Sequence, residues 1–181
     1  MKQASTQSFE KVGLGAGVLL KSYTGILEND LADNNIICAT RAGATLTVPN
    51  GYRNISIDGI KTNTVESYIS DGYTPTISFT ALTTDKDMVI RALGCADIVD
   101  NKVVPRHEFK SSDFKDVYWL GERSDGVTIV CCFNNTISTG GLSWKTNDKG
   151  ELESSITLTA NYTANDQDTV PFYMLELAKQ G

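Results

Sequence analysis

Residues 152–162 read Leu152-Glu153-Ser154-Ser155-Ile156-Thr157-Leu158-Thr159-Ala160-Asn161-Tyr162, with mostly apolar side chains at the even positions and polar side chains at the odd positions. Because successive side chains of a strand point to opposite faces, this alternation predicts a β-strand with one buried and one polar face. Residues 141–146 alternate too, and the intervening Asn147-Asp148-Lys149-Gly150 has the composition of a hairpin turn. The region is therefore expected to form part of an antiparallel sheet with one side facing water or a polar partner.

Further strands are predicted upstream. A second hairpin is indicated at residues 117–133, where Ser124-Asp125-Gly126 supplies the positive φ that a tight reversal requires. Residues 12–20 alternate glycine with Val, Leu and Ala, which predicts a strand with one smooth face rather than a phosphate-binding loop. Shorter β patterns occupy residues 45–48, 52–57, 64–69, 76–82 and 173–177.

One segment has a helical pattern instead. Thr84 is a candidate N-cap, Gly94 is suited to end a helix, and Val89, Ala92 and Leu93 share one helical face. A helix at residues 84–93 is therefore expected to flank the sheets. The expected fold class is mainly β, with two packed antiparallel sheets in a sandwich or barrel, this helix, and a long loop after the first strand. The 181 residues suit a single domain, 1–181.

The long loop covers residues 21–35, which show no sustained hydrophobic period. Loops of this length are uncommon in compact domains unless they have a role. The segment is expected either to be a surface excursion or to be an arm that reaches another subunit, and its residue chemistry does not decide between the two.

Charge and composition exclude several function classes. The 16 basic and 22 acidic side chains, with a net charge of −6, argue against a protein that wraps nucleic acid. No apolar run approaches the roughly 18–20 residues of a membrane span, and residues 1–10 lack the apolar core of a signal peptide. His107 is the only histidine and no nucleophile motif is present, so the chain is not expected to be an enzyme and no catalytic residue is predicted.

The cysteines do not predict a metal site. Cys38, Cys95, Cys131 and Cys132 lack the spacing of zinc ligands, and neighbouring residues on a strand point to opposite faces. They are predicted to be free thiols that act as small apolar residues. Residues 165–169 lack the glycine and the downstream Glu of a calcium loop, which favours a solvated turn. We therefore predict neither a metal nor a cofactor.

Several segments, taken in order, resemble the major tail tube proteins of long-tailed phages and related prophage elements. The resemblance spans roughly residues 36–177. It is carried by residues 53–60, the helix at 84–94, Trp119-Leu120-Gly121-Glu122-Arg123 leading into 127–133, the run 134–142 before the turn at 148–150, and residues 157–162, Asp166, Asp168 and Pro171-Phe172-Tyr173.

The resemblance implies a structural subunit that forms hexameric rings, which stack into a hollow tube for DNA. It implies an inter-ring arm that includes Tyr23, Ile26, Leu27, Glu28, Asp30, Leu31 and Asp33. It also implies a lumen or subunit-contact strand face that includes Glu151, Glu153, Ser155, Thr157, Thr159 and Asn161. An acidic lumen would pass a polyanion without retaining it.

The implied partners are further copies of the chain, the tail terminator, tape measure and distal tail proteins, and DNA in non-specific transit, with no membrane. The implied location is the virion tail, assembled in the host bacterial cytoplasm. Two alternatives stay open. One is the tube of a bacteriocin-like or secretion-type injection device. The other is a carbohydrate- or surface-binding β-sandwich with a shallow site of Tyr68, Tyr73, Trp119 and Trp144, although core packing is the expected role of both tryptophans.

Overall fold

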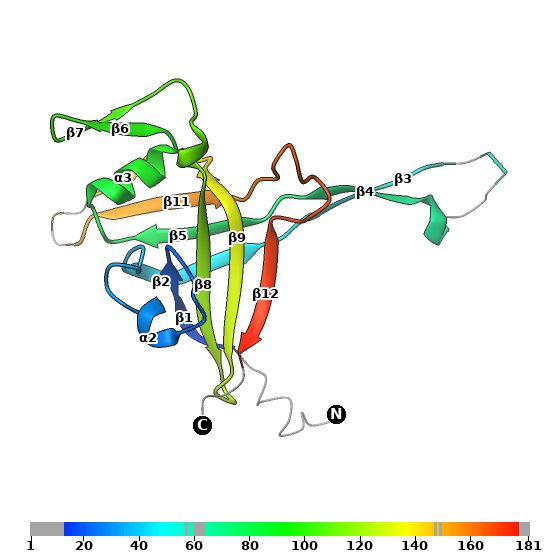
Figure 1. The fold of residues 1–181 in the computed structure, drawn as a ribbon, viewed down its shortest axis with the longest axis horizontal. Helices are drawn as coiled ribbons and strands as arrows, with labels where there is room; N and C mark the ends of the chain where they lie inside the picture. Colours follow the sequence, from blue (N-terminus) through cyan, green and yellow to red (C-terminus); the bar gives the residue numbers. More distant parts are fainter. Residues whose placement is uncertain (1–12, 57, 60–63, 147, 149, 178–181) are drawn as a thin grey trace.

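The structure is a computed structural model that describes residues 13–56, 58, 59, 64–146, 148 and 150–177 (Figure 1). The strands are β1 (Gly13–Leu20), β2 (Thr40–Thr47), β3 (Asn50–Asn54), β4 (Tyr68–Tyr73), β5 (Thr76–Ala81), β6 (Ala96–Val99), β7 (Lys102–Pro105), β8 (Lys115–Arg123), β9 (Thr128–Ser138), β10 (Trp144–Lys145), β11 (Glu153–Thr159) and β12 (Phe172–Leu177). The helices are α2 (Leu27–Asp30), α3 (Lys86–Leu93) and the 3₁₀ turns η1 (Val65–Ser67) and η2 (Ser111–Asp113).

Eight strands form one continuous antiparallel sheet that folds into two layers. The strand order is β1-β8-β9-β11-β5-β2, with β10 also paired to β11 and β12 also paired to β9. Strand β9 belongs to both layers, because its first half pairs with β8 and β12 while Ile137 and Ser138 pair with β11. Figure 1 shows β8, β9 and β12 crossing β5 and β11 at a steep angle. The predicted class, mainly β with antiparallel sheets and a flanking helix, is confirmed.

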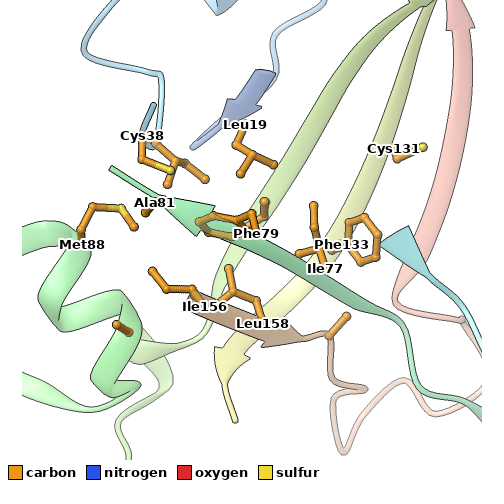
Figure 2. Close-up of a cluster of buried hydrophobic side chains, with 14 residues drawn as sticks. Leu19, Cys38, Ile77, Phe79, Ala81, Met88, Cys131, Phe133, Ile156 and Leu158 are labelled. Atoms are coloured by element: carbon orange, nitrogen blue, oxygen red, sulfur yellow. The ribbon is translucent and has the colours of Figure 1, made fainter. Parts of the chain in front are cut away.

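The main core lies between these two layers (Figure 2). Strand β5 contributes Ile77 and Phe79, β11 contributes Ile156 and Leu158, and β9 contributes Phe133, all of them at most 5% exposed. Removing a side chain of this size from water stabilises the fold by about 1.5–3 kcal/mol. The alternation in residues 152–162 therefore predicted correctly which face of β11 is buried.

Helix α3 begins two residues later than predicted. Asp85, not Thr84, is the N-cap, because its carboxylate accepts a hydrogen bond from the backbone N–H of Met88 at 3.1 Å. A carboxylate at this position satisfies a free amide and also suits the positive end of the helix. Gly94 ends the helix with φ of 81°, as predicted. Met88 and Ala92 bury the inner face of the helix against the core.

Strand β1 corresponds to the predicted glycine-rich strand. Its register with β8 shifts between Leu14 and Val18, and within that shift Gly17 has φ of +69°. A Cβ added at Gly17 would overlap the indole of Trp119, so only glycine allows this close approach. Trp119 packs against the main core as predicted, but the prediction is wrong for Trp144, which is 49% exposed. Its strand, β10, is two residues long and, among the described residues, pairs only with β11, which leaves that side chain at the border of the sheet.

The hairpin of β6 and β7 was not predicted. Its two connecting residues, Asp100 and Asn101, have φ of 47° and 66°, the conformation that a two-residue hairpin turn requires. In the turn predicted at residues 147–150, Asn147 and Lys149 lie outside the described residues. The prediction of free thiols is confirmed, since Cys38, Cys95, Cys131 and Cys132 are all buried and unbridged.

Candidate assembly surfaces

The predicted arm, residues 21–35, is folded against the body of the protein. Its ends are joined by a backbone hydrogen bond from Lys21 N to Asn35 O at 2.8 Å. Tyr23 packs against Tyr118 of β8 with ring centroids 5.9 Å apart. Both rings pack against a second apolar cluster, which is built around Leu20, Leu120 and Val130. This cluster lies on the side of β8 and β9 that faces away from the main core. The segment therefore covers part of the sheet.

Asp30 holds this segment in its folded shape. It is 1% exposed, and its carboxylate accepts hydrogen bonds from Thr24 N and Thr24 Oγ1, both at 2.8 Å, and from Gly25 N at 3.1 Å. Asp30 was predicted as an inter-ring contact and instead serves the local fold. Three other predicted arm residues have surface available for a partner, namely Ile26 (56% exposed), Leu31 (45% exposed) and the exposed Asp33. Tyr23 is packed as described, and the side chains of Leu27 and Glu28 lie outside the described part of the chain.

The predicted lumen or contact face lies on β11 and continues over two neighbouring strands. The hydroxyls of Thr157 and Ser78 are 2.9 Å apart, and those of Thr159 and Thr139 are 3.3 Å apart. Directly opposite residues of paired strands share a face. The register therefore brings eight side chains together, and we call them the hydroxyl face: Thr45, Thr47, Thr76, Ser78, Thr80, Ser155, Thr157 and Thr159.

The charges beside the hydroxyl face are balanced. Arg41 of β2 forms ion pairs with Glu151 and with Glu153, the latter at 2.9 Å, and Lys145 of β10 lies opposite Glu153. A hydrogen bond from its own backbone and the Arg41 guanidinium beside it lower the pKa of Glu151. Two acidic side chains are thus matched by two basic ones. The face is polar through its hydroxyl groups, and it has little net charge.

Asn161, the sixth residue predicted for this face, lies beyond the end of β11. Its side-chain amide donates hydrogen bonds to Asn135 O at 2.9 Å and to Thr159 O at 2.8 Å. The residue therefore fixes the chain where it leaves the strand. The structure brings Glu153, Ser155, Thr157 and Thr159 onto one face and links Glu151 to it through Arg41.

Edge strands give the sheet places to continue into another molecule. Within the described residues β2 pairs only with β5, and β12 pairs only with β9. Strand β12 also leaves Tyr173, Met174 and Leu175 between 39% and 53% exposed. Unpaired N–H and C=O groups along such edges form a template for pairing with a further strand.

The hairpin of β3 and β4 projects from the body and lies at the opposite end of the molecule from α3 (Figure 1). Every residue of β3 is exposed, and Val65 near the tip is 86% exposed. The hydroxyls of Tyr52 and Tyr73 are 2.8 Å apart, and Arg53 pairs with Asp71 at 2.9 Å. The base of the hairpin is fastened by a hydrogen bond from Tyr73 N to the hydroxyl of Tyr162, at 2.9 Å.

The sequence predicted strands at residues 52–57 and 64–69, but β3 ends at Asn54 and the 3₁₀ turn η1 precedes β4, which begins at Tyr68. The projection of the hairpin was not predicted. One feature of the sequence could have predicted the projection. Asn50-Gly51-Tyr52-Arg53-Asn54 has no repeating apolar side, so this strand has no apolar face to bury against the body.

The described residues contain no group of three or more His, Cys, Asp or Glu side chains placed to hold a metal ion. No helix in the same part of the chain is both long enough and apolar enough to cross a membrane. The aromatic residues considered for a carbohydrate site lie on three different strands, with Tyr68 and Tyr73 on β4, Trp119 on β8 and Trp144 on β10.

The fold and these surfaces define a mainly β chain with open sheet edges and a projecting hairpin. No family model and no curated protein matches the chain. The chain is similar to a chain in the virion of a native gene transfer agent particle, with a TM-score of 0.46 and 9% identity, covering 82% of this chain and 92% of that one. A chain in the tail of an empty gene transfer agent particle with C6 symmetry gives the same TM-score and the same coverage at 10% identity.

Proposed function

We propose that the chain is the structural subunit of a phage-like tail tube, which closes into hexameric rings that stack around a channel for DNA. The observation that carries this proposal is the combination, in one chain, of the hydroxyl face, open sheet edges and a projecting hairpin. A small-molecule site gathers a few polar groups in an apolar pocket. Here the polar groups are instead spread evenly over three strands, as on a surface that lines a passage.

In the proposed ring, the sheet of one subunit continues into the sheet of the next. Strand β2 borders the hydroxyl face, so pairing along its outer edge extends that face from subunit to subunit. A contact between two different edges is heterologous, and such contacts close into a ring when the rotation between copies permits it. Six copies then surround a channel with hydroxyl groups.

A channel that conducts DNA must not retain it. Free Lys and Arg side chains bind phosphates strongly because their binding releases counterions, and hydroxyl groups lack that effect. Arg41, the basic residue of β2 beside the hydroxyl face, is held by Glu151 and Glu153. The near-neutral face and the overall charge of −6 therefore favour passage of DNA without capture.

Axial stacking is assigned to two segments. The β3–β4 hairpin extends beyond the body and is the larger contact, and Ile26, Leu31 and Asp33 of the predicted arm form a smaller one. The proposed neighbours at the ends and in the lumen of the tube are the tail terminator, distal tail and tape measure proteins. The proposed site of assembly is the host bacterial cytoplasm, and the final location is the virion tail.

The test is negative-stain electron microscopy of the purified protein over a concentration series, with light scattering on the same samples. We expect rings or hollow tubes of uniform width. A chain that remains monomeric at every concentration, alone and when produced with its neighbouring tail proteins, would contradict the proposal. That result would favour the carbohydrate- or surface-binding alternative.

A further inference from the structure

An open cleft of about 400 Å³ lies between α3, the end of β1 and the start of β8. Ile37 and Met88, both buried, give the cleft an apolar floor. Three basic side chains line its wall: Lys21, which follows β1, Arg91 in the last turn of α3, and Lys115 at the start of β8. An apolar floor with a basic wall suits a ligand that has an apolar part beside a carboxylate.

The acidic residues of the cleft neutralise this wall only in part. Asp87 lies 3.9 Å from Lys21, and Asp116 accepts a hydrogen bond from the backbone N–H of Asn135 at 2.8 Å. Arg91 and Lys115 take part in no ion pair with another described residue, and no described acceptor receives a hydrogen bond from their side chains. Among the described residues, Arg91 and Lys115 therefore have no carboxylate within ion-pair distance, although the charge of Asp87 acts on Arg91.

Arg91 is held where an anion would stabilise it. Burial lowers the pKa of Arg91, and the negative charge of Asp87 opposes that shift. The Cys38 thiol adds no charge near neutral pH, because burial raises its pKa to about 12. A guanidinium group has several N–H donors arranged to bind a carboxylate in a two-point contact, which is among the stronger hydrogen-bonded pairs in proteins. A carboxylate that entered the cleft would therefore gain most at this residue.

The projecting hairpin carries a carboxylate of this kind. Glu66 lies in η1 near the tip, exposed, next to the 86% exposed Val65. Asp71 of the same hairpin is already paired with Arg53, whereas Glu66 has no ion pair with a described residue. The β3–β4 hairpin and α3, which borders the cleft, lie at opposite ends of the molecule in Figure 1. The hairpin therefore cannot reach the cleft of its own subunit, but it can reach the cleft of a second copy.

We infer that the cleft is a carboxylate-binding site for a second copy of this chain, in which Glu66 binds Arg91 and Lys115 while Val65 covers the apolar floor. The inference rests on the proposed self-assembly and identifies its receiving site. Donor and acceptor lie on different surfaces, so each added copy leaves one hairpin and one cleft free. The contact therefore extends a stack without ending it.

A zero-length cross-link tests the contact directly. A water-soluble carbodiimide joins a carboxylate to a touching lysine amine by an amide bond, and the water lost is taken up as the reagent becomes a urea. We expect an intermolecular link between Glu66 and Lys115 in the full-length assembly, identified by mass spectrometry of its peptides. Lys115→Arg keeps the charge but cannot form the link, so its assembly should persist while the linked peptide disappears.

Charge exchange supplies the energetic test. Glu66→Lys and Lys115→Glu should each raise the concentration needed for half-maximal assembly by about tenfold or more, as expected for loss of a charged hydrogen bond, and the double variant should restore it. Glu108→Gln is the matched control, because Glu108 is exposed and lies outside the hairpin and the cleft.

The two proposals fail differently in these experiments. Tubes that form without the Glu66–Lys115 link, or with another acid linked to Lys115, overturn the cleft assignment and leave the tube intact. The link in a small oligomer that never forms tubes supports the cleft and contradicts the tube. Absence of both assembly and link contradicts both.

Discussion

Residues 21–35 and the hairpin at residues 50–73 are both polar, glycine-containing excursions from the sheet, but they differ in how they use their polar groups. The first segment directs Asp30 inward, where three hydrogen bonds fold the chain onto itself. The second pairs strand with strand, and every residue of β3 and the first four residues of β4 are exposed. Segment 21–35 is therefore part of the body, and the hairpin is an extension of it.

This difference shows that irregular sequence does not indicate projection. Segment 21–35 lacks a repeating pattern because the residues that hold it make unlike contacts, such as the buried carboxylate of Asp30 and the packed ring of Tyr23. In the hairpin, the backbone N–H and C=O groups of β3 and β4 form hydrogen bonds with each other. The hairpin can therefore extend from the body without leaving these groups unpaired between its two strands. A segment that makes its own hydrogen bonds is the better candidate for reaching another subunit.

Shortening the hairpin should have the largest effect on assembly. Replacing residues 55–67 by Asn-Gly joins Asn54 to Tyr68, which already face each other, through a turn of the preferred type. We expect long stacks to disappear while the free energy of unfolding changes by no more than about 1 kcal/mol, because none of the described residues in the removed part belongs to the main core. Electron microscopy measures the stacks and urea unfolding measures the stability.

The matched variant in the other region is Ile26→Ser combined with Leu31→Ser, which removes the exposed apolar groups of segment 21–35. A smaller reduction in stack length is expected. Equal loss of stacks in both variants would contradict the ranking of the two contacts. Deleting residues 28–34 is not a suitable comparison, since it removes Asp30 and with it the fold of the segment.

Asp30→Ala should have the largest effect on stability. It removes a carboxylate that accepts hydrogen bonds from Thr24 and Gly25, and it leaves those donors without their partner in a buried position. We expect a loss of about 3 kcal/mol in the free energy of unfolding, measured by urea denaturation. Asp33→Ala, an exposed position of the same segment, should change stability by less than about 0.5 kcal/mol. Equal effects of the two substitutions would show that the carboxylate is not the structural centre of the segment.

The parts of the fold that the sequence predicted are those where a single local pattern determines the structure. Alternation in β11 fixes both its buried face and its polar face, and Gly94 ends α3 because of its own backbone freedom. The polar residues of β11 were also predicted as one face. That face could be predicted only in part, because its neighbours on β2 and β5 follow from strand pairing over long separations in sequence.

The remaining features depend on contacts that no local pattern encodes. Burial of Asp30 requires the turn at Thr24, and the exposure of Trp144 follows from the position of β10 at the sheet edge. The basic cleft combines residues from α3, β8 and the end of β1, which are far apart in the chain. The Asp100-Asn101 turn is the exception, because its composition was a usable signal for the β6–β7 hairpin.

The smallest expected effect concerns the ionisation of tyrosines. One pH titration should distinguish the tyrosines around segment 21–35 from those of the hairpin. Burial raises the pKa of Tyr23, and the negative charge of Asp30 raises it further. Burial likewise raises the pKa of its neighbour Tyr118. In the hairpin, the hydrogen bond with Tyr73 lowers the pKa of Tyr52. As the pH rises, Tyr52 should therefore ionise before Tyr23, which phenolate absorbance measures in Tyr52→Phe and Tyr23→Phe variants.

The direction of these shifts also predicts how stability depends on pH. A tyrosine whose pKa is raised in the folded state contributes stability that is complete below its unfolded pKa, near 10.0, and is lost as the pH rises toward the folded value. The contacts of Tyr23 and Tyr118 should therefore weaken above pH 10, and the stability lost between pH 10 and 11 should be smaller in Tyr23→Phe than in the unchanged chain. Tyr52→Phe should change that loss less, because the Tyr52–Tyr73 hydrogen bond lowers the pKa of Tyr52 and raises that of Tyr73, so the two shifts oppose each other. If Tyr52→Phe protects the protein at high pH and Tyr23→Phe does not, the packed region and the extended one have been assigned the wrong way round.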